Sequence, residues 1–457
     1  MSILVLLPAF LAAYIAATQS PQRALLMVYV PVLLFLPNYY YWILNGLPDP
    51  NFNQATILAI AIVWLIKGAS GWRFSFTDIL VVGFAFTVSY SEYDNAGFKE
   101  LKNLGFDVVG SILLPYVLAK SLIEQQGLRE EFAKQIALVL FFVALLMLPQ
   151  FITGANYSVW QKVLGRFFDG QGWQWATTYR WGLTRASGPY GHPILAGIIL
   201  LIGYRLQRWL EWGNYWPKRI RLFAGFSLSP KIISFGILAG AIMTITRGPL
   251  MAGVVAAVIV MIGKSKQRWL VFMSILVLTI TIGIPLVAWF VDYASVDRQS
   301  LEYGSAQETI VYRWELLEIF IDIGKEKLWW GWGRKGWIHD ELPHSIDNYY
   351  LLLFLQHGIM GLGFLVAIFT IMITRLFIRG MTQPITNSSG NSFEFALLSV
   401  YVVMSLSIAT VWLGEQTVPV LFFLMGWTES ALRYQSTIHH TTMIVPTHHF
   451  RFQRILQ

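Results

Sequence analysis

The sequence predicts an all-α polytopic membrane protein with about 12–14 transmembrane helices. Of its 457 residues, 56% are hydrophobic and only 13% are charged, whereas soluble domains carry about 25% charged residues. Apolar runs long enough to cross a bilayer recur along the chain, separated by short polar loops. Many of the 19 Trp, 20 Tyr and 31 Phe lie beside the predicted boundaries, where amphipathic rings favour the headgroup level.

Thirteen segments have the length and apolarity of membrane spans. They are 2–18, 24–44, 53–66, 78–92, 104–122, 135–154, 191–207, 232–246, 249–263, 269–291, 358–374, 394–412 and 417–432. The first of them lacks a basic leader and a small-residue cleavage site, so we expect it to be retained as a span. We expect a single transmembrane domain over 1–433 and a cytoplasmic tail over 434–457.

Basic residues mark alternate loops, which the positive-inside bias assigns to the cytoplasm. This arrangement predicts a periplasmic N-terminus and a cytoplasmic C-terminus. The net charge of +8 is then explained by topology and does not require a nucleic-acid partner. Because the chain has no cysteine, disulfides, thiolate metal sites and a cysteine nucleophile are excluded.

The two longest loops, about 155–190 and 292–357, fall on the opposite, periplasmic face. Loops of this length usually carry function. The second contains an amphipathic helical pattern. Its apolar face is formed by Ile310, Trp314, Leu317 and Ile321, and its polar face by Arg313, Glu315, Glu318 and Asp322. We therefore expect amphipathic helices in this loop, lying on the membrane surface or covering a cavity.

Cations accumulate on this face, although topology does not require them there. The 155–190 loop has a single acid, Asp169, against Lys162, Arg166, Arg180 and Arg185. Arg247 lies in a very short turn between two spans, where an unpaired charge in hydrocarbon would cost at least ~2.5–3.5 kcal/mol. Arg247 either caps the carbonyls of the preceding helix or converges with Arg185 on an anion such as a lipid-linked diphosphate.

Several motifs follow in a characteristic order: Arg185 before Gly188-Pro-Tyr-Gly-His-Pro193, then Thr246-Arg-Gly248, then Arg313 ahead of Gly331-x-Gly333, and finally His344 and Asn348 before the turn Gly358–Leu362. In this order and on this common face, the sequence resembles the O-antigen ligase and Wzy-type polymerase superfamily over roughly 150–380. His192, beside Pro193, is expected to begin the helix that follows.

The resemblance implies a GT-C-like fold in the bacterial inner membrane, with its active site on the periplasmic face. It implies transfer of a glycan from undecaprenyl diphosphate to a glycan or lipid acceptor, by single displacement with inversion, with no metal and no cofactor. Other polysaccharide assembly proteins are possible partners.

Displacing a diphosphate requires charge stabilisation of the leaving group and a base for the attacking hydroxyl. We expect Arg185 and Arg247, assisted by Arg313, to bind the diphosphate. We expect His344 to accept the proton. In many relatives the histidine directly precedes the asparagine, whereas here three residues separate His344 from Asn348, so a nearby carboxylate is an alternative base: Asp340, Glu341 or Asp347.

Aromatic residues offer candidate sugar-binding surfaces on the same face. The candidates are Trp330, Trp332, Asn348 and Tyr349. For the tryptophans, a place in the interfacial aromatic belt explains the pattern equally well.

Among functions, we favour a Wzy-type polymerase that joins lipid-linked repeat units. A ligase that moves the finished glycan onto lipid A-core or another acceptor is the alternative. A flippase or transporter is the alternative of another class, but transporters often have internal repeats and midplane polar sites, whereas the unusual residues here gather on one face.

Overall fold

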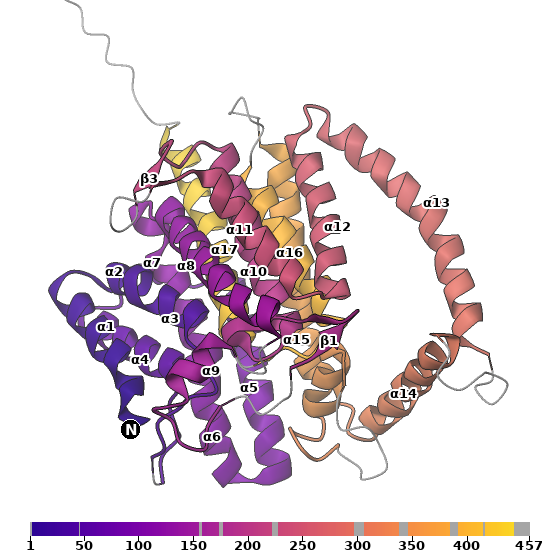
Figure 1. Ribbon diagram of the computed structural model, residues 1–457, viewed down its shortest axis with the longest axis horizontal. Coiled ribbons are helices and arrows are strands. Elements are labelled where there is room, and N and C mark those ends of the chain that lie inside the picture. Colours follow the sequence, from indigo (N-terminus) through magenta and orange to yellow (C-terminus); the bar gives the residue numbers. More distant parts are fainter. Residues whose placement is uncertain are drawn as a thin grey trace, which may run out of the picture.

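The computed structural model describes residues 2–44, 46–154, 158–172, 177–221, 227–296, 306–337, 346–383, 392–414 and 416–442. This part of the chain is almost entirely helical, and its four short strands form two antiparallel hairpins. Figure 1 shows the helices gathered in one bundle, with α13 and α14 standing apart at one edge. The all-α fold class is therefore confirmed.

The elements of the first half begin with a 3-10 turn, η1, and continue through helices and π-helical turns. They are η1 (Ser2–Val5), α1 (Leu6–Thr18), α2 (Pro21–Ala24), η2 (Leu25–Tyr29), α3 (Val30–Phe35), α4 (Phe52–Ile66), α5 (Phe76–Ala96), α6 (Phe98–Val108), η3 (Val109–Leu113), α7 (Leu114–Leu122), η4 (Glu124–Gln126), α8 (Arg129–Thr153) and α9 (Val159–Leu164).

The second half contains both hairpins and the longest helices. Its elements are β1 (Tyr179–Arg180), β2 (Leu183–Thr184), η5 (Gly188–Tyr190), α10 (Pro193–Trp212), β3 (Ile220–Arg221), β4 (Ser227–Leu228), α11 (Pro230–Met243), α12 (Arg247–Lys264), α13 (Arg268–Ala294), α14 (Ala306–Glu326), α15 (Tyr349–Thr382), α16 (Phe393–Ile408) and α17 (Thr417–Thr442).

Each of the thirteen predicted spans contains one helix or a continuous series of two or three helical elements. Six helices in the described part of the chain are long and apolar enough to cross a membrane, and five shorter helices are also apolar. The prediction for 24–44 was wrong beyond Phe35, where the helix ends. Leu36 is extended and precedes Pro37, and proline disfavours helical backbone in the residue before it.

Two spans contain a π-helical turn just before a proline. The turn η2 ends two residues before Pro31, and η3 ends two residues before Pro115. Proline has no N–H to donate to the preceding turn, and a wider turn accommodates the displaced carbonyls. Both prolines are therefore kept inside otherwise continuous helices.

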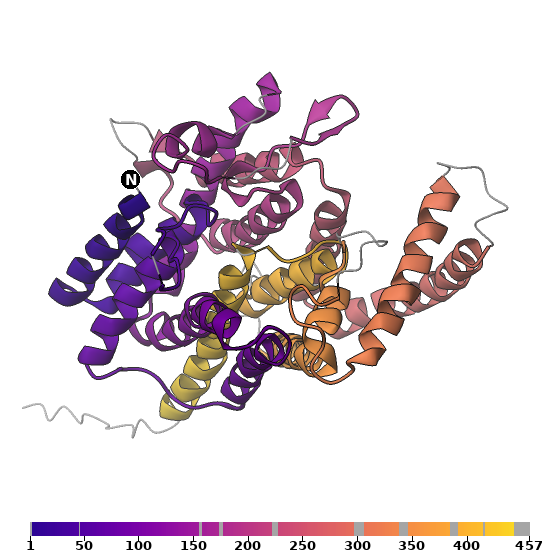
Figure 2. The same ribbon diagram turned by 90° about the horizontal axis from the view of Figure 1, so that it is seen from below.

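Small residues allow the helices of the bundle to pack closely, as is usual in membranes. A Cβ atom on Gly236 or Gly240 of α11 would lie 2.5–2.6 Å from Phe141 or Ala144 of α8. On α17, Gly426 lies against the backbone of Tyr116 in α7. Seen from below in Figure 2, α17 (yellow) runs through the bundle, where it packs against α7 and α15.

Helix α13 is the exception, because none of the residues from Trp269 to Tyr293 is buried. Its buried first residue, Arg268, attaches it to the bundle by donating to the carbonyl oxygens of Gly263, Gly380 and Gln383 at 2.7–2.9 Å. The exposed rings of Trp269 and Trp289 lie roughly 30 Å apart along the helix at ~1.5 Å per residue. This spacing matches the hydrocarbon thickness of a bilayer.

The predicted amphipathic helix is confirmed as α14, with Leu317 and Ile321 on its packed face. That face also contributes Phe320, which is buried in a small core with Trp337 and Leu355. This core joins α14 to the first turns of α15. Through Trp337 and the partly buried Trp332, it also holds the tryptophan-rich motif that follows α14.

Helix α15 is kinked at Gly358, whose φ of 63° lies in the left-handed region. The kink frees carbonyls that receive the Trp-Gly-Trp-Gly segment: the N–H of Trp332 donates to Leu355 O at 2.8 Å and that of Gly333 to Gln356 O at 2.9 Å. The backbones approach so closely that a Cβ on Gly358 would overlap the carbonyl of Trp329.

We expect Gly358→Ala to destabilise the protein by about 1–3 kcal/mol, because alanine is strained at this φ and meets the Trp329 carbonyl. Gly363→Ala is the matched control, since it lies in the same helix with no atom within 4 Å of an added Cβ. Thermal unfolding of the purified protein in detergent measures the difference. Equal unfolding midpoints for the two variants would contradict this account of the kink.

Candidate active site

The turn between α11 and α12 is the centre of the candidate site. Ile245 adopts φ 47°, a conformation that is unusual for a β-branched residue. The hydroxyl of Thr244 donates to Ala241 O at 2.6 Å and lies 2.9 Å from that of Thr246. The turn is therefore sharp, strained and held by its own side chains, and such strain is typical of functional sites.

The β1–β2 hairpin packs against this turn and supplies two arginines. Trp181 and Gly182 at its tip both have positive φ, as a tight two-residue hairpin turn requires. Arg180 donates from Nη1 to Ile245 O at 3.0 Å, and Arg185 donates from Nε to Thr244 O at 3.4 Å. The arginines thus help to hold the strained turn, since its carbonyls accept from them.

Arg247 is the first residue of α12 and is exposed. Its guanidinium carbon lies 5.2 Å from the centroid of the Trp181 ring. The turn carries Arg247, and the hairpin segment beside it carries Arg180 and Arg185. The convergence of Arg185 and Arg247 on an anion stays a prediction. The alternative prediction was that Arg247 caps the carbonyls at the end of α11. Arg180 and Arg185 donate to those carbonyls instead.

Within the described residues, no carboxylate forms an ion pair with Arg180, Arg185 or Arg247. Elsewhere in the bundle, some buried cations have acidic partners, as Lys120 has Asp78, and others donate to backbone carbonyls, as Arg268 does. Three arginines that share one turn without a counter-ion make a region of positive potential suited to an anion with several oxygens.

Two side chains near the turn respond to burial and to this positive charge. Burial, and secondarily the nearby Arg180, lowers the pKa of Arg185. Burial and the charge of Arg185 lower the pKa of His192 to about 4, so this side chain is neutral near pH 7. His192 caps α10, as expected for a residue that begins a helix, and its Nδ1 accepts from the N–H of Ile194 at 3.3 Å. The N-termini of α10 and α12 both contribute positive dipole ends here.

Two further segments reach the same end of the bundle. A Cβ on Gly248 would lie 2.5 Å from the hydroxyl oxygen of Thr410, which follows α16. Five residues before Thr410, the backbone oxygen of Ser405 in α16 accepts from the Tyr350 hydroxyl of α15 at 3.0 Å. The loop after α16 and the first turn of α15 therefore lie on the side of the arginines.

Asn348 and the tryptophans, expected as sugar-binding residues, have structural contacts. Asn348 caps α15, because its Oδ1 accepts from the N–H groups of Tyr350 and Leu351 at 3.0 and 3.3 Å. Trp332 donates from its indole to Ile323 O at 2.9 Å. Trp330 stacks edge-on against Tyr90 of α5 with ring centroids 4.7 Å apart. Sugar binding by these residues stays a prediction, as it does for Tyr349.

Sequence patterns missed one ion pair beside the tryptophan motif. Glu92 of α5 accepts from the backbone N–H of Arg334 at 2.9 Å and from its Nε at 3.4 Å. In the same place the amide of Asn95 donates to Gly331 O at 3.1 Å. Polar residues of α5 therefore hold the glycine-rich segment, and no spacing in the sequence connects them to it.

Part of the expected catalytic set lies outside the described residues, namely His344, Asp340 and Glu341. Asp347 is described and exposed, directly before the α15 cap. Arg313 belongs to α14, and only its place in that helix is described. The identity of the base thus stays a prediction.

An apolar groove of about 510 Å³ lies between α3 and α8, lined by residues that include Val32, Phe35, Phe142 and Leu146. One turn beyond Leu146, the Gln150 side chain of α8 accepts from the N–H groups of Ser187 and Gly188 at 3.2 and 3.4 Å. The groove therefore leads along α8 towards the loop that carries Arg185.

Residues 232–366 match the family model described as O-antigen ligase. This segment runs from α11 through the kink of α15, so it contains the strained turn with Arg247. The match confirms the resemblance drawn from the motifs and supports a polysaccharide ligase or polymerase kind of function. No curated protein sequence matches the chain.

We expect acidification to destabilise the wild type more than His192→Asn, which removes the titrating group and keeps a good helix cap. Between pH 6.5 and 4, the unfolded chain binds the His192 proton and the folded chain does not. The free energy of unfolding contributed by this residue therefore falls as the pH falls through this window. Unfolding midpoints at several pH values measure it, and parallel curves for the two proteins would refute it.

Proposed function

We propose, from the O-antigen ligase match over residues 232–366, that the protein is a membrane glycosyltransferase that takes its glycan from undecaprenyl diphosphate at the periplasmic face. The observation that carries the proposal is the group of three arginines around the α11–α12 turn, which have no carboxylate partner among the described residues. Guanidinium groups suit phosphate oxygens, and a lipid-linked diphosphate presents these at the membrane surface.

In the proposed reaction, the acceptor hydroxyl oxygen forms a bond to the anomeric carbon while the bond from that carbon to the diphosphate oxygen breaks. Undecaprenyl diphosphate leaves with the bonding electron pair, and its added negative charge is stabilised by Arg185 and Arg247, with Arg313 assisting. His344, or a neighbouring carboxylate, takes the hydroxyl proton. A single displacement of this kind inverts the anomeric configuration.

The apolar groove between α3 and α8 supports the same donor. An isoprenoid chain needs an apolar surface that opens to lipid, and the groove offers one beside the exposed Phe142 and Leu145. The contact between Gln150 and the backbone of Ser187 ties the groove to the arginine-bearing loop. We therefore place the lipid chain along α8 and its diphosphate at the turn.

Two acceptors fit this chemistry. A polymerase would use the growing lipid-linked glycan as acceptor, and this remains our first choice. The description of the matching family favours a ligase, for which lipid A-core or another acceptor would be needed. Both enzymes would bind the donor diphosphate in the same way, so the Arg247 variant tests either one. The products of the reaction distinguish the two acceptors.

We expect Arg247→Ala to lower the transfer rate by about 10²-fold, in line with the loss of one charge-stabilising donor. Because Arg247 is exposed, the variant should fold normally. Lys162→Ala is the matched control, since it removes an exposed cation of α9, in the predicted 155–190 loop, that is not part of the α11–α12 turn. Reconstituted protein with a lipid-linked oligosaccharide measures transfer. Full activity of Arg247→Ala would refute the diphosphate role.

We expect the wild type to convert a purified lipid-linked repeat, supplied as the sole substrate, into a ladder of longer glycans if it is a polymerase. Gel separation by length detects the ladder, and Arg247→Ala serves as the negative control. Conversion only after lipid A-core is added would identify a ligase and contradict the polymerase assignment. His344→Ala, in the same assay, should lose activity unless a carboxylate is the base.

A further inference from the structure

A polar cavity of about 420 Å³ lies at the end of the bundle where α7 and α17 finish. Its wall contains Arg73, Lys120 and Arg433, together with Gln125, Ser430 and Tyr434, and none of its lining residues is acidic. The loop before α5 closes one side, because Gly71 lies against the end of α7 with φ 91°. The cavity is therefore bounded by fixed backbone.

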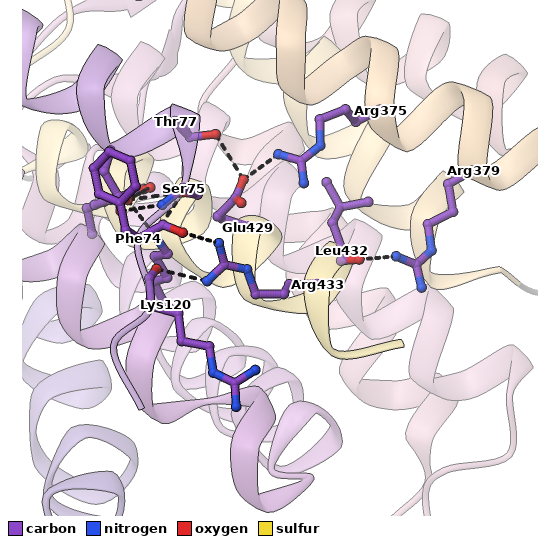
Figure 3. A network of polar contacts seen from close by, with 12 residues as sticks. Phe74, Ser75, Thr77, Lys120, Arg375, Arg379, Glu429, Leu432 and Arg433 are labelled. Carbon is purple, nitrogen blue, oxygen red and sulfur yellow. Dashed lines mark hydrogen bonds and ion pairs between the residues drawn. The ribbon is translucent and has the colours of Figure 1, made fainter. Parts of the chain in front are cut away.

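The three cations of the wall differ in how their charges are compensated. Lys120 is buried and paired with Asp78, so it adds little net charge. Arg433 donates to the carbonyl oxygens of Arg73 and Phe74 at 2.8 and 2.5 Å, as Figure 3 shows for Phe74. Within the described residues, the exposed Arg73 side chain makes no hydrogen bond and no ion pair. The wall therefore has an excess of positive charge.

Neighbouring acids are already engaged with other groups. Figure 3 shows Glu429 between Thr77 and Arg375, and Arg379 directed at the carbonyl of Leu432. These contacts hold α17 against α5 and α15. Glu429 is therefore engaged by Thr77 and Arg375, and among the described residues no carboxylate lines the cavity.

From these contacts we propose that the cavity binds a phosphate-bearing anion, either the headgroup of an anionic phospholipid or a free phosphate. Arg73 and Arg433 supply charge-assisted donors, and the hydroxyls of Ser430 and Tyr434 supply neutral ones. Arg433 follows Thr417 by sixteen positions, so the cavity lies roughly 24 Å along α17 from the end that carries the candidate active site, at ~1.5 Å per residue. It is therefore a site separate from the donor site.

The experiment uses the full chain in detergent with three probes: phosphatidylglycerol, phosphatidylcholine as the neutral-headgroup reference, and inorganic phosphate. Native mass spectrometry counts retained lipid, and thermal unfolding follows phosphate. Arg73→Gln is the test variant, since its side chain is exposed and has no partner in the described chain. Arg23→Gln is the matched control, because it removes an exposed arginine in α2 that does not line the cavity.

We expect Arg73→Gln to weaken phosphatidylglycerol binding by about fivefold, the effect of losing one charge-assisted contact at a partly hydrated site. Loss of phosphatidylglycerol from Arg73→Gln alone identifies a lipid headgroup. A phosphate-induced rise in the unfolding midpoint that only Arg73→Gln lacks identifies a free anion. Equal binding by wild type and Arg73→Gln, or an equal loss in Arg23→Gln, overturns the proposal. Each result is independent of glycosyl transfer.

Discussion

Hydrocarbon offers no hydrogen-bond partner, and the organisation of this protein follows from that constraint. Charged side chains that are drawn into the bundle gather at its two ends, and the two ends satisfy them differently. At the end where α7 and α17 finish, Lys120 meets Asp78 and Arg375 meets Glu429. At the end where α12 begins, the arginines meet backbone carbonyls and an aromatic face. At the first end carboxylates neutralise part of the positive charge, although Arg73 has no such partner among the described residues, and the second end retains the charge of its three arginines.

The retained charge depends on a turn that the chain would not adopt without help. Ile245 has a backbone conformation that β-branched residues avoid, and carbonyl contacts from Arg180 and Arg185 hold it. The turn and its arginines already have a fixed geometry, so these groups would need little further ordering to bind an anion. Such preorganisation is what electrostatic stabilisation of a leaving group demands.

The fold was largely predictable because apolarity and length are local properties of the sequence. Local signals also explain the one wrong boundary, since the helix ends at Phe35 before a proline while the apolar run continues. The site was less predictable. Asn348 and Trp332 were expected to bind sugar, but their side chains bond to backbone, and residue type and motif order cannot distinguish support from substrate contact. The pair of Glu92 with Arg334 joins residues 242 positions apart, for which no spacing rule exists.

Helix α13 has a different relation to the sequence from every helix packed in the bundle. Its first turns pack on α15, where the Phe272 ring lies 4.9 Å from that of Phe377. The residues from Leu276 to Tyr293 are not buried, so bilayer lipid must stabilise this part of the helix. Shape complementarity places little demand on these positions, and one apolar residue can replace another there at little cost. Over evolutionary time the lipid-facing residues of this helix should change freely, while its length stays matched to the thickness of the membrane.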